Sequence, residues 1–216
     1  MENSVQPATP PDALMLLGTH CPHCPMVLLA LANLVKTGVI GKLEVYNIEA
    51  RPEVVQELGV RSIPWVRIGP FELEGMHSEK ELGQWAAQAG TIDGLANYLD
   101  ELLSSGRIQQ ALRLIPDQPR SLDALLQLFA SPDTRLGTRI GISAIMEDLS
   151  GSEMLAGIVD RLGELTRHED ARVRGDACHY LELSGSERAV PYLTPLLEDP
   201  DAGVRDIARE SLERLG

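Results

Sequence analysis

The spacing of apolar residues changes near Gly90, and this change divides the chain into two parts with different folds. Before Gly90, short apolar runs alternate with helical segments, whereas after it every segment has helical spacing. Glycine or proline marks each boundary in the second part, at residues 106, 116–119, 132, 151, 185 and 200. The sequence therefore predicts an α/β domain followed by an all-α domain.

The first part is predicted to contain strands and helices in the order βαβαββα. The predicted strands are 13–17, 42–48, 60–68 with a break at Pro64, and 71–74, and the predicted helices are 21–36, 51–58 and 78–88. Ser78 and Glu81 have the spacing of a capping box at the start of the last helix. This order describes a βαβ unit, an antiparallel hairpin and a closing helix.

The second part contains an internal repeat with an offset of 31 residues. The sequence Asp-Ala-Arg-Val-Arg at 170–174 recurs as Asp-Ala-Gly-Val-Arg at 201–205, and a weaker copy begins at Asp133. The leucines that precede each copy keep the same offset: Leu162 and Leu165 correspond to Leu193 and Leu196. Periods of roughly 30 to 47 residues with two helices per unit indicate a solenoid. These turns resemble those of HEAT repeats over about residues 120–216.

Charge and cysteine usage limit the possible partners and the compartment. The formal net charge is −13, and a surface this acidic repels phosphate, so we expect no nucleic acid and no membrane as partners. The first residues lack the basic and apolar regions of a signal peptide, and no apolar run reaches the roughly 18 residues of a membrane span. We therefore expect a cytoplasmic protein. Two of the three cysteines are separated by only two residues, which in a reducing compartment favours catalysis or metal binding.

The sequence Cys21-Pro22-His23-Cys24 lies where a predicted helix follows a buried strand. Unpaired amide groups and the helix dipole at such a helix start stabilise a thiolate, and an imidazole at His23 favours it further. Pro22 lacks an N–H at a position that would have no helical partner. Cys21 is expected to be the more exposed sulfur, which attacks a disulfide, and Cys24 the sulfur that resolves the mixed disulfide.

Several further motifs occur in the order found in the thioredoxin superfamily. They are Asn47-Ile48-Glu49, Gly59-Val60-Arg61-Ser62-Ile63-Pro64, Gly75, and a proline directly after the second cysteine, Pro25. Residues 12–90 therefore resemble that superfamily. The cysteine motif looks most like two branches, the protein disulfide oxidoreductases of thermophiles and the N-terminal domain of the alkyl hydroperoxide reductase flavoprotein.

The resemblance implies a role for each matching residue. Cys21 is the nucleophile, Cys24 the resolving thiol and Pro64 a cis-proline; the backbone of Ile63 pairs with an extended substrate, and Gly75 leaves room for it. No cofactor is expected beyond the redox-active Cys21–Cys24 disulfide. The sequence departs from the family pattern at His20 and Trp65, and it shows no buried acid beneath Cys24.

Several single residues also allow other roles. The sequence His20-Cys21-Pro22-His23-Cys24 could bind zinc, although a second ligand pair is missing. Cys178 is expected to be a buried structural thiol, and His168 and His179 solvated helix residues. For His77, close after Gly75, a place near the redox groove is the less favoured of two alternatives. Arg174 and Arg205 are expected to stabilise turns by pairing with nearby aspartates.

The predicted fold is an α/β thioredoxin-like domain followed by an all-α HEAT-repeat-like solenoid. The expected divisions are a leader at 1–12, the thioredoxin-like domain at 13–90, linking helices at 91–118 and repeats at 119–216. The predicted activity is thiol–disulfide exchange on protein disulfide or dithiol substrates, with a reductase or thiol donor as the redox partner and a protein partner docked on the repeats. The alternative is a scaffold or chaperone-like adaptor in which the cysteine pair is not essential. The direction of exchange is left open.

Overall fold

The computed structural model describes residues 9–216, and the chain forms two compact units. The first unit ends at Leu95 and the second begins at Ala96. Most of the expected leader, residues 1–8, lies outside the described residues. Its last residue, Asp12, begins the first strand.

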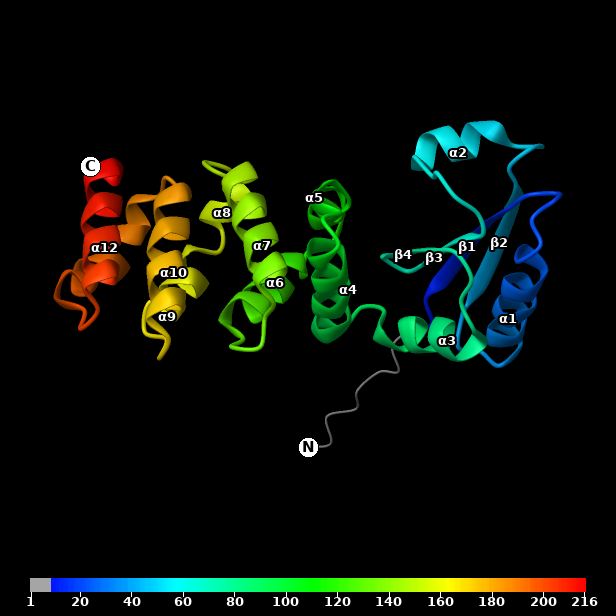
Figure 1. The fold of residues 1–216 in the computed structure, drawn as a ribbon, viewed down its shortest axis with the longest axis horizontal. Coiled ribbons are helices and arrows are strands. Elements are labelled where there is room, and N and C mark those ends of the chain that lie inside the picture. Colours follow the sequence, from blue (N-terminus) through cyan, green and yellow to red (C-terminus); the bar gives the residue numbers. More distant parts are fainter. Residues whose placement is uncertain (1–8) are drawn as a thin grey trace. The chain divides into compact units, whose positions relative to one another are not determined.

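The first unit has the predicted order of elements (Figure 1). They are β1 (Asp12–Leu17), α1 (Cys24–Lys36), β2 (Lys42–Asn47), α2 (Pro52–Leu58), β3 (Trp65–Ile68), β4 (Phe71–Glu74) and α3 (Glu79–Gln88). The strands form one mixed sheet in the order β2-β1-β3-β4. β1 runs parallel to β2 and antiparallel to β3, and β3 and β4 form the antiparallel hairpin. The carboxyl ends of β1 and β2 therefore meet at the same edge of the sheet.

One face of this sheet is buried beneath α1 and α3. Successive residues of a strand point to opposite faces, so alternate residues of β1 and β3 reach this core. The core residues of the sheet and the two helices are Ala13, Met15, Val66, Ile68, Leu73, Val27, Ala30, Leu31, Leu34, Leu82 and Ala86. The predicted capping box of α3 is confirmed: the Ser78 hydroxyl accepts from the Glu81 amide, and the Glu81 carboxylate accepts from the Ser78 amide at 2.8 Å. The cap fixes where α3 starts against the core.

Two predicted element boundaries were wrong. The first helix begins at Cys24 and not at Cys21, because Pro25, and not Pro22, occupies its first turn. The strand predicted from residue 60 begins at Trp65. Pro64 has no N–H for a strand ladder and also restricts the backbone of Ile63, so the segment before it stays outside the sheet.

The second unit is helical throughout, as predicted, and residues 96–216 contain no strand. Its elements, counting α4, which spans the division between the units, are α4 (Ile92–Ser104), α5 (Ile108–Asp117), α6 (Ser121–Ala130), α7 (Leu136–Asp148), α8 (Glu153–Ala156), α9 (Val159–Leu165), α10 (Ala171–Leu183), η1 (Glu187–Ala189), α11 (Val190–Leu193), η2 (Thr194–Glu198) and α12 (Ala202–Leu215). Short connections join helices into neighbouring pairs (Figure 1).

The sequence repeat corresponds to a structural repeat of helix starts. Asp170 caps α10 by accepting from the Arg172 amide at 2.9 Å, and Asp201 caps α12 by accepting from the Gly203 amide at 2.8 Å. The weaker copy differs at this point. The residue that precedes α7 is Arg135, which makes no side-chain cap, so Asp133 does not take the capping role.

An ion pair joins the first turn of α10 to the turn before α12. Arg174 contacts the Asp199 carboxylate twice, at 2.7 Å from Nε and 2.8 Å from Nη2, and its Nη1 donates to the carbonyls of His168 and Glu169, both at 2.9 Å. The hydrogen bond from Arg174 lowers the pKa of Asp199. Arg205 donates to the backbone carbonyls of Asp199 at 2.6 Å and Pro200 at 3.1 Å, so both arginines contact Asp199 in a turn as predicted, but only Arg174 pairs with its carboxylate.

Candidate active site

The loop between β1 and α1 leads into the cysteine pair. At its first residue, Gly18, the side chains of Ile63 and Glu49 approach the loop closely. A Cβ atom on Gly18 would lie 2.5 Å from Cδ1 of Ile63 and 3.1 Å from Oε1 of Glu49. Only glycine therefore lets the Ile63 side chain rest on this loop in its present position. The Cys21 amide donates to the Gly18 carbonyl at 3.3 Å and closes the turn that leads into the cysteines.

Cys21 and Cys24 form a disulfide bond at the start of α1. Cys24 is buried in the core beneath the sheet, whereas Cys21 is partly exposed. The Cys24 amide donates to Sγ of Cys21 at 3.1 Å. The exposed sulfur thus lies against a backbone donor at the N-terminal end of a 13-residue helix, where negative charge on sulfur is stabilised.

Pro64 and Gly75 lie in the two segments that approach β3 and leave β4. The Ile63–Pro64 peptide bond is cis, and the Gly75 amide donates to the Pro64 carbonyl at 2.8 Å. Gly75 has a φ of 87°, a conformation that favours glycine. Within residues 9–216, no hydrogen bond engages the backbone of Ile63. Its N–H and C=O are therefore free to pair with an added strand.

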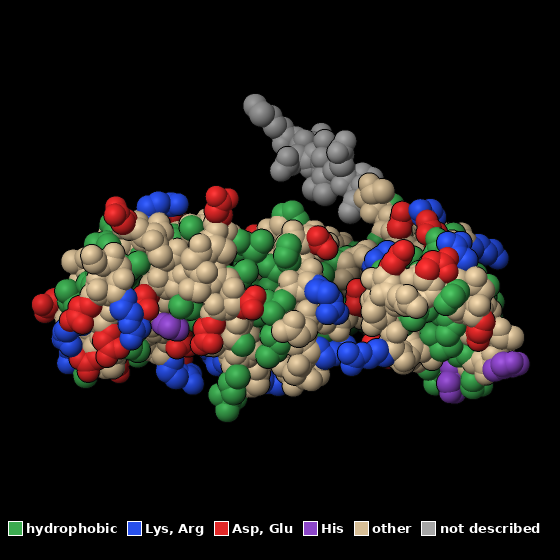
Figure 2. Space-filling model, turned by 90° about the horizontal axis from the view of Figure 1, so that it is seen from above, with side chains coloured by type: hydrophobic (Ala, Val, Ile, Leu, Met, Phe, Trp, Pro, Cys, Tyr) green, Lys and Arg blue, Asp and Glu red, His purple; other side chains and the backbone are tan. Residues whose placement is uncertain are grey.

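Exposed apolar side chains and histidines lie close in the sequence to the cysteine loop and to Gly75. Met26 and Leu29 on α1 are 66% and 64% exposed, and Met76, directly after Gly75, is 58% exposed. His23 is exposed and precedes α1, while His77 contacts the Glu74 carbonyl at 3.1 Å. Figure 2 shows histidine side chains beside hydrophobic ones on one face of this domain. Because residues 26–31 are all apolar, their sequence pattern does not show which of them face the solvent.

Two polar residues at the end of β2, not selected as site residues from the sequence, also contact the loop. The Glu49 carboxylate accepts from the Thr19 amide, at 3.1 Å to Oε1 and 3.2 Å to Oε2, and Asn47 Nδ2 donates to the Thr19 hydroxyl at 3.2 Å. The parallel pairing of β1 and β2 gives the signal that could have found them, because residues after two adjacent parallel strands meet at one edge.

The third cysteine and two of the histidines, His168 and His179, belong to the repeats, whereas His20 directly precedes Cys21 and is exposed. Cys178 is fully buried in α10, and burial raises the pKa of its thiol to about 12. His168 Nδ1 lies 3.1 Å from the Asp170 amide, and His179 Nδ1 lies 3.7 Å from Glu182. In the described part of the chain, no three His, Cys, Asp or Glu side chains are grouped to hold a metal ion.

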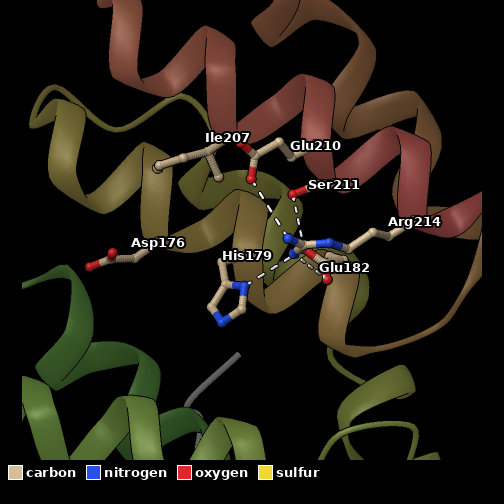
Figure 3. A pocket seen from close by; sticks show the side chains of 8 residues that line it. Asp176, His179, Glu182, Ile207, Glu210, Ser211 and Arg214 are labelled. Carbon is tan, nitrogen blue, oxygen red and sulfur yellow. Dashed lines mark hydrogen bonds and ion pairs between the residues drawn. The ribbon is translucent and has the colours of Figure 1, made fainter.

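A groove lies between α10 and α12 of the repeats (Figure 3). Its lining residues are Gly175, Asp176, His179, Glu182, Ile207, Glu210, Ser211 and Arg214. Arg214 contacts Glu182 at 2.9 Å and Glu210 at 3.7 Å, which closes one end with a charged network. Asp176 forms no ion pair or hydrogen bond within residues 9–216, and Ile207 is partly exposed beside it.

The fold and the disulfide together define a protein with a thioredoxin fold and a CxxC disulfide. Residues 13–87 match the thioredoxin domain family, and residues 149–213 match the HEAT repeats. The chain is thus a thioredoxin domain followed by HEAT repeats. No curated protein matches the chain. Within residues 9–216, no helix has the length and apolar content needed to cross a membrane.

Proposed function

We propose that the protein is a thiol–disulfide oxidoreductase that acts on protein substrates. The observation that carries the proposal is the unequal environment of the two sulfurs. Cys21 is partly exposed and receives a backbone hydrogen bond, while Cys24 is buried behind it. This arrangement supports an attacking sulfur and a resolving sulfur with distinct roles.

In the reducing direction, the Cys21 thiolate attacks one sulfur of a substrate disulfide. The substrate S–S bond breaks, its other sulfur leaves as a thiolate that takes a proton, and a mixed disulfide with Cys21 forms. Cys24, as its thiolate, then attacks Sγ of Cys21 and releases the second substrate thiolate. The two electrons now reside on the substrate, and a reductase or thiol donor returns Cys21–Cys24 to the dithiol. Oxidation of a substrate dithiol is the same sequence in reverse.

Substrate binding is proposed to use the free backbone beside Pro64. An extended substrate segment would pair with the N–H and C=O of Ile63, as an added strand pairs with a sheet edge, and Gly75 would leave space for it. The exposed side chains of Met26 and Met76 would contact apolar residues of the substrate. Pro22 and His23 support the site by shaping the turn and by placing an imidazole beside the sulfurs.

The repeats are proposed to dock a protein partner. In this proposal, residues 13–90 carry the redox chemistry, residues 91–118 link the two domains, and residues 119–216 select the partner. The protein is proposed to act in the cytoplasm. Support comes from the groove of Figure 3, where the unpaired Asp176 carboxylate and the exposed Ile207 side chain are available for contact. The rival function, a binding scaffold with a non-essential cysteine pair, uses the same repeats without exchange at Cys21.

The experiment is a trap for mixed disulfides. A Cys24→Ser variant lacks the resolving sulfur, so proteins attacked by Cys21 should remain attached and be released by reductant, whereas Cys21→Ser should retain none. An Asp176→Lys change added to the trap variant should alter which proteins are retained, and the same change in the protein with both cysteines should leave the rate of insulin reduction unchanged. Asp206→Lys, at an exposed position of α12, is its control. No release of protein by reductant, with no reduction of insulin by the wild type, would favour the scaffold.

A further inference from the structure

We propose that Glu49 is a positioning residue for the exchange reaction. Its carboxylate holds the Thr19 amide and so fixes the loop that presents Cys21 beside Ile63. This inference rests on the proposed function. It assigns a role to a residue outside both the cysteine pair and the segment of residues 59–64 that ends at Pro64, which we call the proline loop. We call Thr19, Asn47 and Glu49 the Thr19 clamp.

The clamp contacts Thr19 at two different groups. Both oxygens of Glu49 lie within hydrogen-bond distance of the Thr19 amide, at 3.1 and 3.2 Å, and Asn47 Nδ2 donates to the Thr19 hydroxyl at 3.2 Å. The Asn47 side chain also orients Glu49, because its Oδ1 accepts from the Glu49 amide at 2.9 Å. The end of β2 is thus tied to the loop after β1 through side chains as well as through the sheet.

The clamp also lies against the proline loop. The Glu49 carboxylate and the Ile63 side chain both approach the position that a Cβ on Gly18 would take. Gly18 accepts from the Cys21 amide, and Thr19 lies two residues before Cys21. A shift of Thr19 would therefore move Cys21 relative to Ile63.

The separation between Cys21 and Ile63 matters for a protein substrate but not for a small reagent. A substrate held on the Ile63 backbone brings its sulfur to a fixed place, and attack is fast only when the reacting atoms are aligned. A small alkylating agent approaches the Cys21 thiolate from solution and needs no such alignment. The clamp should thus affect the rate at which Cys21 reacts with protein disulfides, and it should leave the rate of alkylation of the Cys21 thiolate unchanged.

The test uses three substitutions of Glu49 in the full chain. Glu49→Gln keeps an acceptor oxygen at the same reach, Glu49→Asp keeps the charge but is one methylene too short, and Glu49→Ala removes both. Glu57→Ala, an exposed carboxylate on α2, is the matched control. We expect reduction of insulin by the Ala and Asp variants to be about five-fold slower, the scale of one partly solvated hydrogen bond, and the Gln variant and the control to match the wild type.

A second readout separates positioning from general damage. The rate of alkylation by iodoacetamide, at a pH where Cys21 is fully ionised, should be equal in all variants. Insulin reduction at the wild-type rate by both Glu49→Asp and Glu49→Ala would overturn the proposal, as would rescue by Asp but not by Gln. An equal loss in alkylation and insulin reduction would also overturn it, because it would indicate a structural role.

The hydrogen bonds of the clamp can be tested even if the protein proves not to catalyse thiol–disulfide exchange. If the wild type reduces no disulfide, the function is wrong, and hydrogen exchange of the Thr19 amide then measures the clamp alone. Faster exchange in Glu49→Asp than in Glu49→Gln supports the clamp, and equal exchange in these two variants overturns it.

Discussion

Removing the carboxylate of Asp199 should destabilise the repeats more than any surface substitution in them. The Asp199 side chain is only 4% exposed and that of Arg174 only 12%. The two groups make two short hydrogen bonds, and Asp199 also accepts from the Asp201 amide at 2.9 Å. In Asp199→Ala, a largely buried guanidinium keeps its two backbone carbonyl partners and loses its counter-charge.

The magnitude follows from the burial of the pair. Removal of one partner from a buried ion pair costs about 3 to 5 kcal/mol. We take about 3 kcal/mol, the lower end of that range, because His168 and Glu169 still accept from Arg174. For a unit of this size, each kcal/mol lowers the melting temperature by about 4 °C, so the expected decrease is about 12 °C.

The assay is thermal unfolding of the full chain followed by circular dichroism at 222 nm, with Asp206→Ala as the matched control. Asp206 also belongs to the last repeat and pairs with Arg209, but its side chain is 68% exposed, so its removal should cause no measurable change. Equal melting temperatures for the two variants would refute the assignment of stability to the buried pair.

The same pair predicts the sign of a pH effect. Arg174 lowers the pKa of Asp199 in the folded state, relative to about 3.9 in an unfolded chain. The stabilisation is therefore complete above the unfolded pKa and is lost as the pH falls through the lower folded pKa. The difference in melting temperature between wild type and Asp199→Ala should shrink in that acidic range and stay constant at higher pH.

The remaining predictions concern the sulfurs and the surface near them. In the reduced protein, Cys21 should be alkylated first at mildly acidic pH, as mass spectrometry can show; earlier labelling of Cys24 would reverse their assigned roles. Cys178, whose pKa is raised to about 12, should stay unlabelled at pH 8 until denaturant is added, and labelling of the native chain would contradict its burial. Met26→Ser should raise KM for insulin roughly three-fold through lost apolar contact, with no change for a small chromogenic disulfide; equal effects on both substrates would argue against substrate contact.

Local patterns in the sequence predicted most of the fold. The capping box of α3, the order of strands and the caps at Asp170 and Asp201 depend on residues within a few positions of each other, so a sequence reveals them. The break at Pro64 was predicted, but the residues before it were still assigned to the strand, whereas β3 begins only after the break, at Trp65.

Contacts between distant segments were the part that the sequence concealed. The partner of Arg174 lies 25 residues further on, and Thr19 meets Glu49 across 30 residues. Neither distance corresponds to a helix or strand period. The cysteine pair was found because its two members are neighbours, whereas the Thr19 clamp required the parallel pairing of β1 and β2 to be known first.

The burial of Cys178 has a practical consequence for measuring electron transfer in this protein. Since that sulfur does not react in the native state and Cys24 is buried as well, a count of accessible thiols reports Cys21 alone, one per chain when the pair is reduced and none when it is oxidised. An equilibrium titration against a glutathione buffer can then be followed by thiol counting, without replacing any residue. The curve should have the slope of a two-electron couple, about 30 mV for each tenfold change in the ratio of reduced to oxidised chain.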